Sequence, residues 1–141
     1  MQKRVLAIDD DTAITELLSM LLRTHGYDVL TANTGEEGVK IIQEKSPDVI
    51  VLDLMMPGMD GWQVCKQVRT FSNVPIIILS ALDDPAMIAS ALDAGADDYL
   101  VKPISSNILV AHLNRLILRT GGLNGAQQAL LHASQSQPST S

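Results

Sequence analysis

Short apolar runs and segments of helical period alternate five times along this 141-residue chain, which restricts its fold more than any other feature. The apolar runs, which we predict to be strands, cover residues 4–8, 27–32, 49–52, 75–80 and 98–101. The intervening segments repeat apolar residues at spacings of three and four, and we predict helices over residues 12–25, 36–45, 61–71, 85–94 and 106–119. Continuous apolar strands that alternate with helices are typical of a parallel sheet with helices on both faces.

The first helical segment carries its own start and stop signals. Asp11 is an expected N-cap, and Gly26 is expected just past the last helical residue. The apolar stripe of this helix consists of Ile14, Leu17, Leu18, Leu21 and Leu22. A stripe of this kind indicates a helix with one face against a core.

Right-handed crossovers leave few arrangements for five parallel strands. We predict an α/β fold of the flavodoxin-like (βα)5 type, which is a doubly wound parallel sheet in the strand order 2-1-3-4-5. In this order the first and third strands are neighbours, and a crevice forms where their carboxyl ends meet.

Composition narrows the class of protein. The formal net charge of −6 argues against direct nucleic-acid binding by this chain, and the single cysteine, Cys65, excludes an internal disulfide and suits a reducing compartment. The first apolar run is too short for a signal peptide, and no run is long enough to span a bilayer. We therefore expect a cytoplasmic protein without a membrane partner.

The end of the chain has a different composition from the rest. Residues 120–141 contain no Asp, Glu, Lys or Arg and are rich in Gly, Gln and Ser. Such a composition is typical of a linker or tail. We predict a domain over residues 1–119 followed by a tail over residues 120–141.

Three acidic residues are predicted to converge at the crevice. Asp9 and Asp10 end the first strand, and Asp53 ends the third. Two carboxylates about 4 Å apart repel by roughly 1 kcal/mol in water, so such a cluster either raises a pKa or binds a cation. All-oxygen ligands suit Mg²⁺, with Mn²⁺ as the alternative. The plainer interpretation, that the acids only cap the next helix, suits Asp11 but does not account for Asp53.

Two further polar residues end the fourth and fifth strands. Ser80 offers a hydroxyl that can donate to an anionic oxygen, and Lys102 offers an ammonium group. Pro103 fixes the backbone after the lysine, which can aim the lysine inward. Each residue alone has an ordinary explanation, as a strand end or a solvated charge. Chance is a poor explanation for all of these groups together at the ends of four strands.

These residues resemble those of the receiver domains of two-component response regulators. The matching text is "VLAIDDD", "PDVIVLDLMMPGMDG", "PIIILSA" and "GADDYLVKP", and the resemblance covers about residues 3–119. By this resemblance Asp53 is the phosphoacceptor. Asp9 and Asp10 would hold Mg²⁺ together with Asp53 and the backbone carbonyl of Met55.

The resemblance also implies a switch and a supporting set. Lys102 would pair with the phosphoryl oxygens, Ser80 would report their arrival, and Tyr99 matches the aromatic switch position. The supporting residues are small or restrict the backbone: Ala81 after the serine, Pro103 at the family's cis-proline position, and the turn residues Pro57, Gly58 and Gly61.

The implied function is a signalling switch rather than an enzyme with turnover. The donor would be a sensor histidine kinase or a histidine phosphotransfer protein that docks near the first helix and the loop after the fifth strand. Many transcription-regulating receivers also form a homodimer through the fourth helix, fifth strand and fifth helix. This sequence departs from that pattern, because residues 83–95 contain no Lys or Arg and the fifth helix has Ile108 and His112 where Glu and Arg are usual.

Two other functions compete with this one. A phosphate-independent interaction module with the same fold commonly lacks part of the acidic set, and this chain retains all of it. A phosphatase of the haloacid-dehalogenase type also uses an Asp nucleophile, but such enzymes carry a second Asp two residues later, where this chain has Met55.

Overall fold

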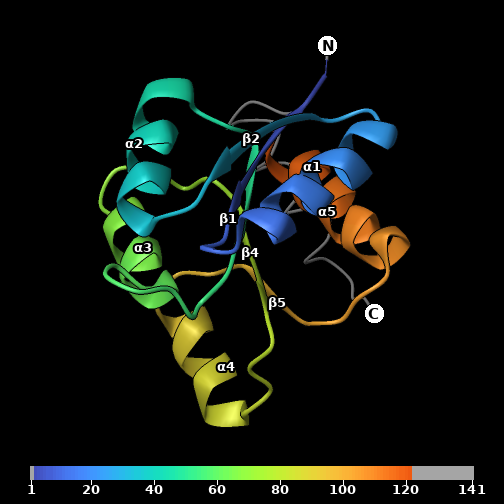
Figure 1. The fold of residues 1–141 in the computed structure, drawn as a ribbon. Coiled ribbons are helices and arrows are strands. Elements are labelled where there is room, and N and C mark those ends of the chain that lie inside the picture. The colour runs from blue at the N-terminus through green and yellow to red at the C-terminus, as the bar shows by residue number, and fades with distance from the viewer. Residues whose placement is uncertain (1, 122–141) are drawn as a thin grey trace, which may run out of the picture.

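The architecture is a three-layer α/β sandwich in this computed structural model, which describes residues 2–121. The strands are β1 (Arg4–Ile8), β2 (Asp28–Ala32), β3 (Val49–Leu52), β4 (Ile76–Ser80) and β5 (Asp98–Val101). The helices are α1 (Thr12–Thr24), α2 (Gly35–Lys45), α3 (Gly61–Val68), α4 (Pro85–Asp93) and α5 (Ser106–Gly121). Each helix follows the strand of the same number (Figure 1).

All five strands are parallel and lie in the order β2-β1-β3-β4-β5, which confirms the predicted flavodoxin-like fold. The register places Ile8 beside Leu52 at the ends of the neighbouring strands β1 and β3. It also places Ser80 beside Val101 at the ends of β4 and β5. The residues that follow these four strands therefore leave the sheet at one common edge.

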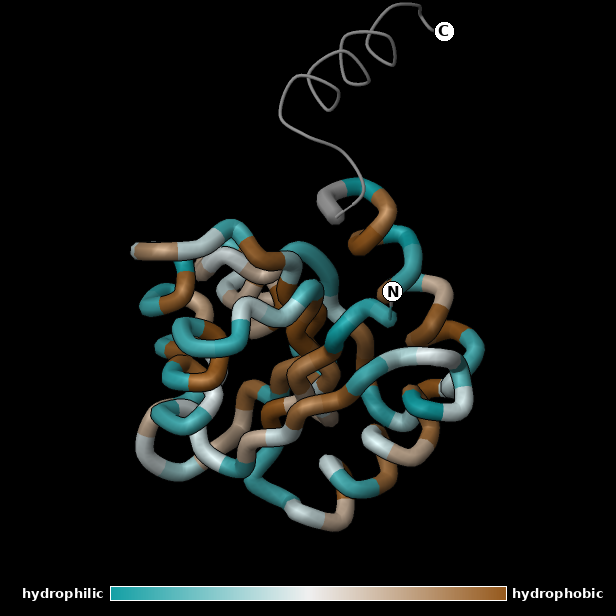
Figure 2. Tube along the Cα trace, turned by 90° about the horizontal axis from the view of Figure 1, so that it is seen from above, coloured by the Kyte–Doolittle hydropathy of each residue, from teal (hydrophilic) through white to brown (hydrophobic). Residues whose placement is uncertain are grey.

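Helices cover both faces of the sheet. In Figure 1 α2, α3 and α4 lie on one side of the strands, and α1 and α5 lie on the other. Successive strand residues alternate between the two buried clusters, since Leu6 and Ile8 belong to the first cluster and Val5 and Ala7 to the second. The hydrophobic stretches accordingly run through the middle of the molecule in Figure 2.

The ends of the first helix form as the sequence indicates. The side chain of Asp11 accepts a hydrogen bond from the backbone N–H of Ala13, as expected for an N-cap. The helix ends at Thr24 with His25 as its C-cap, and Gly26 has a φ of 90°, a conformation that favours glycine. Both predicted boundary residues are confirmed.

Two helices differ in length from the prediction by two residues or more. Helix α3 ends at Val68, three residues early, because the Arg69 guanidinium instead bonds the carbonyls of Ser72, Val74 and Gly95 and holds the following loop in a different path. Helix α5 continues to Gly121, two residues beyond the predicted domain end. The rest of the predicted tail lies outside the described residues. Within the described part of the chain, no helix has the length and apolar character needed to cross a membrane.

Candidate functional site

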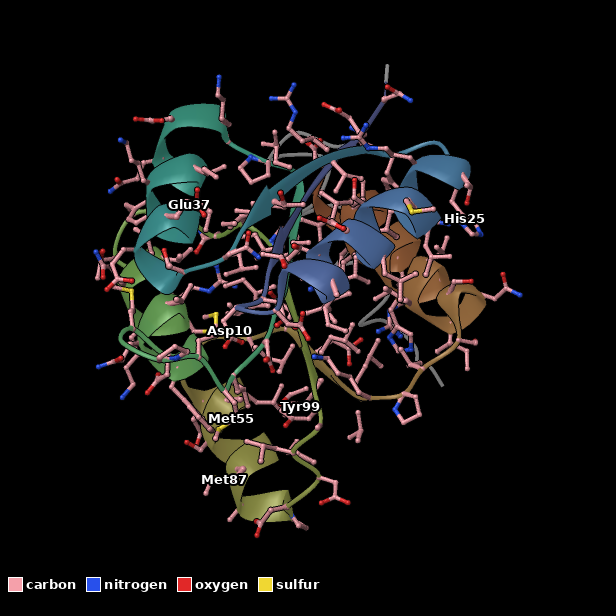
Figure 3. All side chains as sticks on the ribbon, viewed as in Figure 1. Asp10, His25, Glu37, Met55, Met87 and Tyr99 are labelled. Carbon is pink, nitrogen blue, oxygen red and sulfur yellow. The ribbon has the colours of Figure 1, made fainter. Side chains whose placement is uncertain are left out.

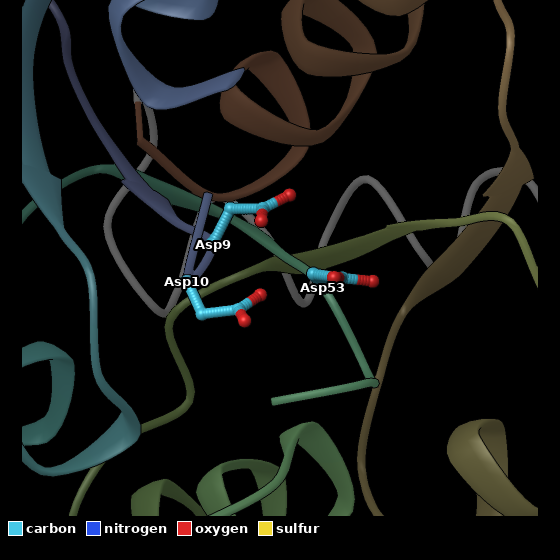
Figure 4. A group of neighbouring side chains, drawn as sticks. All are labelled: Asp9, Asp10 and Asp53. Carbon is cyan, nitrogen blue, oxygen red and sulfur yellow. The ribbon is translucent and has the colours of Figure 1, made fainter. Parts of the chain in front are cut away.

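Three carboxylates meet at the common edge of the sheet, as predicted. One oxygen each from Asp9, Asp10 and Asp53 lies within 4.8 Å of the other two (Figure 4). Their backbones are brought together by the β1–β3 pairing, which continues as the N–H of Asp53 donates to the carbonyl of Ile8 at 3.0 Å. Asp9 and Asp53 are buried, whereas Asp10 is exposed, so the cluster opens to solvent on one side.

Lys102 approaches this cluster from the end of β5. Its Nζ lies 2.9 Å from Oδ2 of Asp9, and its backbone N–H donates to the carbonyl of Ser80 at 2.8 Å. The peptide bond between Lys102 and Pro103 is cis. The ammonium group therefore lies among the carboxylates, where its charge partly offsets their mutual repulsion.

Burial sets the electrostatic state of Asp53. Loss of hydration raises the pKa of its carboxyl above the ordinary value, and the nearby charge of Asp9 raises it further. The charge of Lys102, the hydroxyl of Ser80 and the backbone of Met55 oppose this rise in pKa without cancelling it. Asp53 is thus a buried carboxylate whose negative charge is incompletely compensated by the protein, which favours the approach of a cation.

Ser80 and Tyr99 form a second group beside the carboxylates. Ser80 is fully buried, and its hydroxyl accepts a hydrogen bond from the N–H of Leu82 at 3.3 Å. The hydroxyl of Tyr99 donates to the carbonyl of Leu82 at 2.6 Å, and burial raises the pKa of that phenol. Both side chains are therefore attached to the loop that joins β4 to α4.

Met55 lies on the solvent-exposed side of the site. Its side chain is 59% exposed, and it lies on the same side of the molecule as Asp10 and Tyr99 in Figure 3. The predicted role of its carbonyl as a metal ligand remains a prediction. Oxygen donors from three carboxylates fit the preference of Mg²⁺, and the exposed side of the cluster leaves room for water ligands.

The supporting residues shape the turn after Asp53. Gly61 packs so tightly that a Cβ atom there would lie 2.5 Å from the carbonyl oxygen of Asp53, and Gly58 has a φ of 74°. Pro57 is exposed in the same turn, and Ala81 is exposed beside Ser80. Only glycine fits at position 61 without displacing the backbone of Asp53.

Sequence analysis did not identify Asn33. The side-chain N–H of this residue donates to the backbone carbonyl of Asp9 at 2.8 Å. A signal was available, because Asn33 directly follows β2 and β2 was predicted to neighbour β1. A polar residue at that strand end lies near the acidic pair whenever the two strands are neighbours, so the topology could have pointed to it.

The acidic residues of β5 and the residue before it pair within the chain. Asp98 contacts His112 and lies 2.8 Å from Arg115 of α5. Asp97 lies 2.9 Å from Arg69 and 3.7 Å from Arg119. These pairs join β5 and the residue before it to Arg69 and to α5 within one chain.

Comparison with known proteins identifies the family. The family model described as the response regulator receiver domain matches residues 5–114. The transcriptional regulatory protein AfsQ1 of Streptomyces coelicolor is 44% identical over 117 residues, which is 83% of this chain and 52% of that protein. Response regulator MprA of Mycobacterium leprae is 45% identical over 118 residues, again 83% of this chain and 52% of that protein. The chain thus spans about half the length of these relatives.

Solved structures agree with this assignment. The Francisella response regulator 1452 receiver domain matches with a TM-score of 0.80 and 39% identity, covering 84% of this chain and 99% of that one. A two-component response regulator from Clostridium difficile matches with a TM-score of 0.81 and 31% identity, covering 85% of this chain and 99% of that one. Fold, site and sequence agree, and the chain belongs to the response-regulator receiver family.

Proposed function

We propose that this chain accepts a phosphoryl group on Asp53 in a reaction that requires Mg²⁺, and that the product changes a protein-interaction surface. The observation that carries the proposal is the convergence of Asp9, Asp10 and Asp53 within 4.8 Å, beside the ammonium of Lys102. A buried carboxylate with a raised pKa gains most from a partner that brings positive charge.

The reaction transfers a phosphoryl group from a donor nitrogen to a carboxylate oxygen. A carboxylate oxygen of Asp53 forms a bond to phosphorus while the bond from phosphorus to the donor nitrogen breaks, and the imidazole of the donor leaves with the electron pair. When bound, Mg²⁺ neutralises charge on the phosphoryl oxygens and orients them. Asp9 and Asp10 would hold it, together with Asp53 and the carbonyl of Met55, and Mn²⁺ could replace it.

Lys102 supplies the second positive charge. Its ammonium is bonded to Asp9 and already acts on the pKa of Asp53, so it lies within the field of the acceptor carboxylate. We expect it to turn toward the phosphoryl oxygens once they arrive, because they carry nearly two negative charges at neutral pH. Positioning and charge neutralisation are the main sources of rate in such transfers.

Ser80 and Tyr99 would transmit the event. The Ser80 hydroxyl can leave the N–H of Leu82 and donate to a phosphoryl oxygen. The Tyr99 hydroxyl is bonded to the carbonyl of the same Leu82, so movement of that loop changes the position of the tyrosine side chain. The loop leads directly into α4, so the change reaches the surface of α4 and β5 as a population shift.

A docking place for the donor lies next to the site. Helix α1, helix α5 and the loop after β5 border a groove of about 230 Å³. It is mainly apolar and is lined by Ile14, Leu17, Leu18, Leu21, Leu79, Lys102, Pro103, Ile104, Ser106 and Leu109. Lys102 belongs to both the groove and the acidic site, so a sensor histidine kinase or histidine phosphotransfer protein seated here would present its phosphohistidine close to Asp53.

The competing functions fit less well. A phosphatase of the haloacid-dehalogenase type would need an acid at position 55, which is Met55 with an exposed side chain. An interaction module that ignores phosphate has no use for two buried carboxylates at one edge, since their burial costs stability.

Intact mass spectrometry tests the proposal. With a small phosphodonor and Mg²⁺, the wild-type chain should gain one phosphoryl group, and the gain should disappear in EDTA and in Asp53→Asn. Asp11→Asn is the matched control, because it removes one charge two residues from Asp9 and keeps a good helix cap. Repeated turnover of a phosphate ester would instead indicate a phosphatase, and no gain with any donor would indicate an interaction module.

A further inference from the structure

Asn33 directly follows β2, and its side-chain amide bonds a backbone carbonyl of the acidic site and a neighbouring hydroxyl. Its side-chain N–H donates to the carbonyl of Asp9 at 2.8 Å and to the hydroxyl of Thr15 at 3.1 Å. Thr15 is buried, 2% exposed, and its own hydroxyl donates to the carbonyl of Thr12 at 3.1 Å. One amide thus ties the start of the β1–α1 turn, which carries the acidic pair, to the first turn of α1.

Asn33 is itself held by two elements. Its backbone N–H donates to the Glu37 carboxylate on α2 at 2.8 Å. The carbonyl of the preceding residue, Ala32, accepts from the N–H of Asp9 at 3.2 Å. The side-chain amide therefore projects from a fixed backbone, and the turn it holds is attached to the sheet and to α2.

We infer that Asn33 is a positioning residue that holds Asp9 and Asp10 in place for the divalent cation; the inference rests on the proposed function. The three carboxylates repel one another, so without a restraint the turn would relax by moving the acidic pair outward. A neutral donor provides that restraint without adding charge to the site. Pre-organised ligands bind a cation more tightly because less of the binding free energy is spent on ordering them.

Calorimetric titration with Mg²⁺ alone tests the inference on the full chain. We expect Asn33→Ala to raise the dissociation constant by about fivefold, the equivalent of roughly one neutral hydrogen bond. Thr15→Val, which keeps the shape of the side chain but removes the accepting hydroxyl, should raise it by a smaller factor. The double variant should bind about as weakly as Asn33→Ala, because both changes break the same restraint.

Thr34→Ala is the matched control. Thr34 is the N-cap of α2 and accepts from the N–H of Glu37 at 3.0 Å, so its loss should lower the urea midpoint measured in EDTA. It contacts neither Asp9 nor Thr15 in the hydrogen bonds of the site, and we expect Mg²⁺ affinity to stay within twofold of wild type. A change in affinity that follows stability in all variants would overturn the inference.

Other outcomes separate the inference from the proposed function. If wild type binds Mg²⁺ and Asn33→Ala binds it equally well, Asn33 has no positioning role and the proposed function stands. If Asn33→Ala does not fold, Thr15→Val decides, and an unchanged affinity in that variant overturns the inference. If wild type itself takes up no Mg²⁺, the proposed function fails and the inference fails with it.

Discussion

At the scale of single residues, the acidic site lowers the stability of the fold mainly through Asp53. A folded-state pKa above the unfolded value means that the folded chain holds the proton more tightly than the unfolded chain does. The group therefore favours folding at pH values below its unfolded pKa, and this contribution is lost as the pH rises through its folded pKa. Function and stability are opposed at this position, as is common for acidic clusters that await a ligand.

Asp53→Asn should accordingly stabilise the chain at neutral pH in the absence of metal. We expect a gain of about 1 kcal/mol, the order of the repulsion between two unit charges 4 Å apart in water. The gain should shrink as the pH falls through the raised pKa of folded Asp53 and disappear below the ordinary aspartate pKa of about 4, because the wild-type carboxyl then carries its proton in both states. Urea unfolding in EDTA at several pH values measures it. A gain that is independent of pH would contradict the electrostatic cause.

Met55 and Leu82 lie two residues after Asp53 and Ser80, and both are apolar. We expect them to keep hydrolytic water from the phosphorylated carboxyl. Polar substitutions at both positions should speed phosphate loss by about tenfold, less than a fully positioned general base provides. The decay of the phosphorylated form, followed by mass, measures this. Met87→Gln is the control, since Met87 is also exposed but lies on α4, and an unchanged decay in the double variant would refute the shielding role.

At the scale of elements, α4 is attached more weakly than the other helices. Among its residues only Ala91 is buried, whereas α5 buries Leu109, Leu113, Leu116 and Ile117. An element with little buried apolar surface opens at low free energy. This suits a switch, because α4 follows the loop to which Ser80 and Tyr99 are bonded.

Hydrogen exchange should show this difference directly. We expect the amides of α4 to exchange about tenfold or more faster than those in the middle of α5, as is typical of low-stability segments. Phosphorylation should change the exchange of α4 and of the β4–α4 loop more than that of α1. Equal protection of α4 and α5, both before and after phosphorylation, would refute the coupling through Leu82.

At the scale of the whole molecule, the arrangement of charge bears on assembly. The acids Asp97 and Asp98 are paired within the chain, and residues 83–95 offer no base to a second copy. We therefore expect the unphosphorylated chain to sediment as a monomer at micromolar concentration. A stable dimer that dissociates in Asp97→Asn would show that these acids pair between chains instead.

The fold could be predicted from the sequence because the signals for each strand and helix are local and repeated. The β-branched runs, the helical stripes and the cap at Asp11 each point to one element, and handedness of the crossovers then restricts the order. The convergence of Asp9, Asp53 and Lys102 could be predicted as well, because they occupy strand ends that the order brings together. The predicted end of α3 was wrong, since the Arg69 guanidinium bonds the carbonyl of Gly95, which is distant in sequence. Asn33 was missed for the same reason, because its role depends on a tertiary contact.

The most direct test of the central claim is to locate the phosphoryl group by chemical reduction. Borohydride converts an aspartyl phosphate to homoserine, which peptide mass spectrometry can assign to a residue. After reaction with a small phosphodonor and Mg²⁺, the account predicts homoserine at position 53 alone, and none when EDTA is present. Label at any other position, or equal label without the metal, would contradict it.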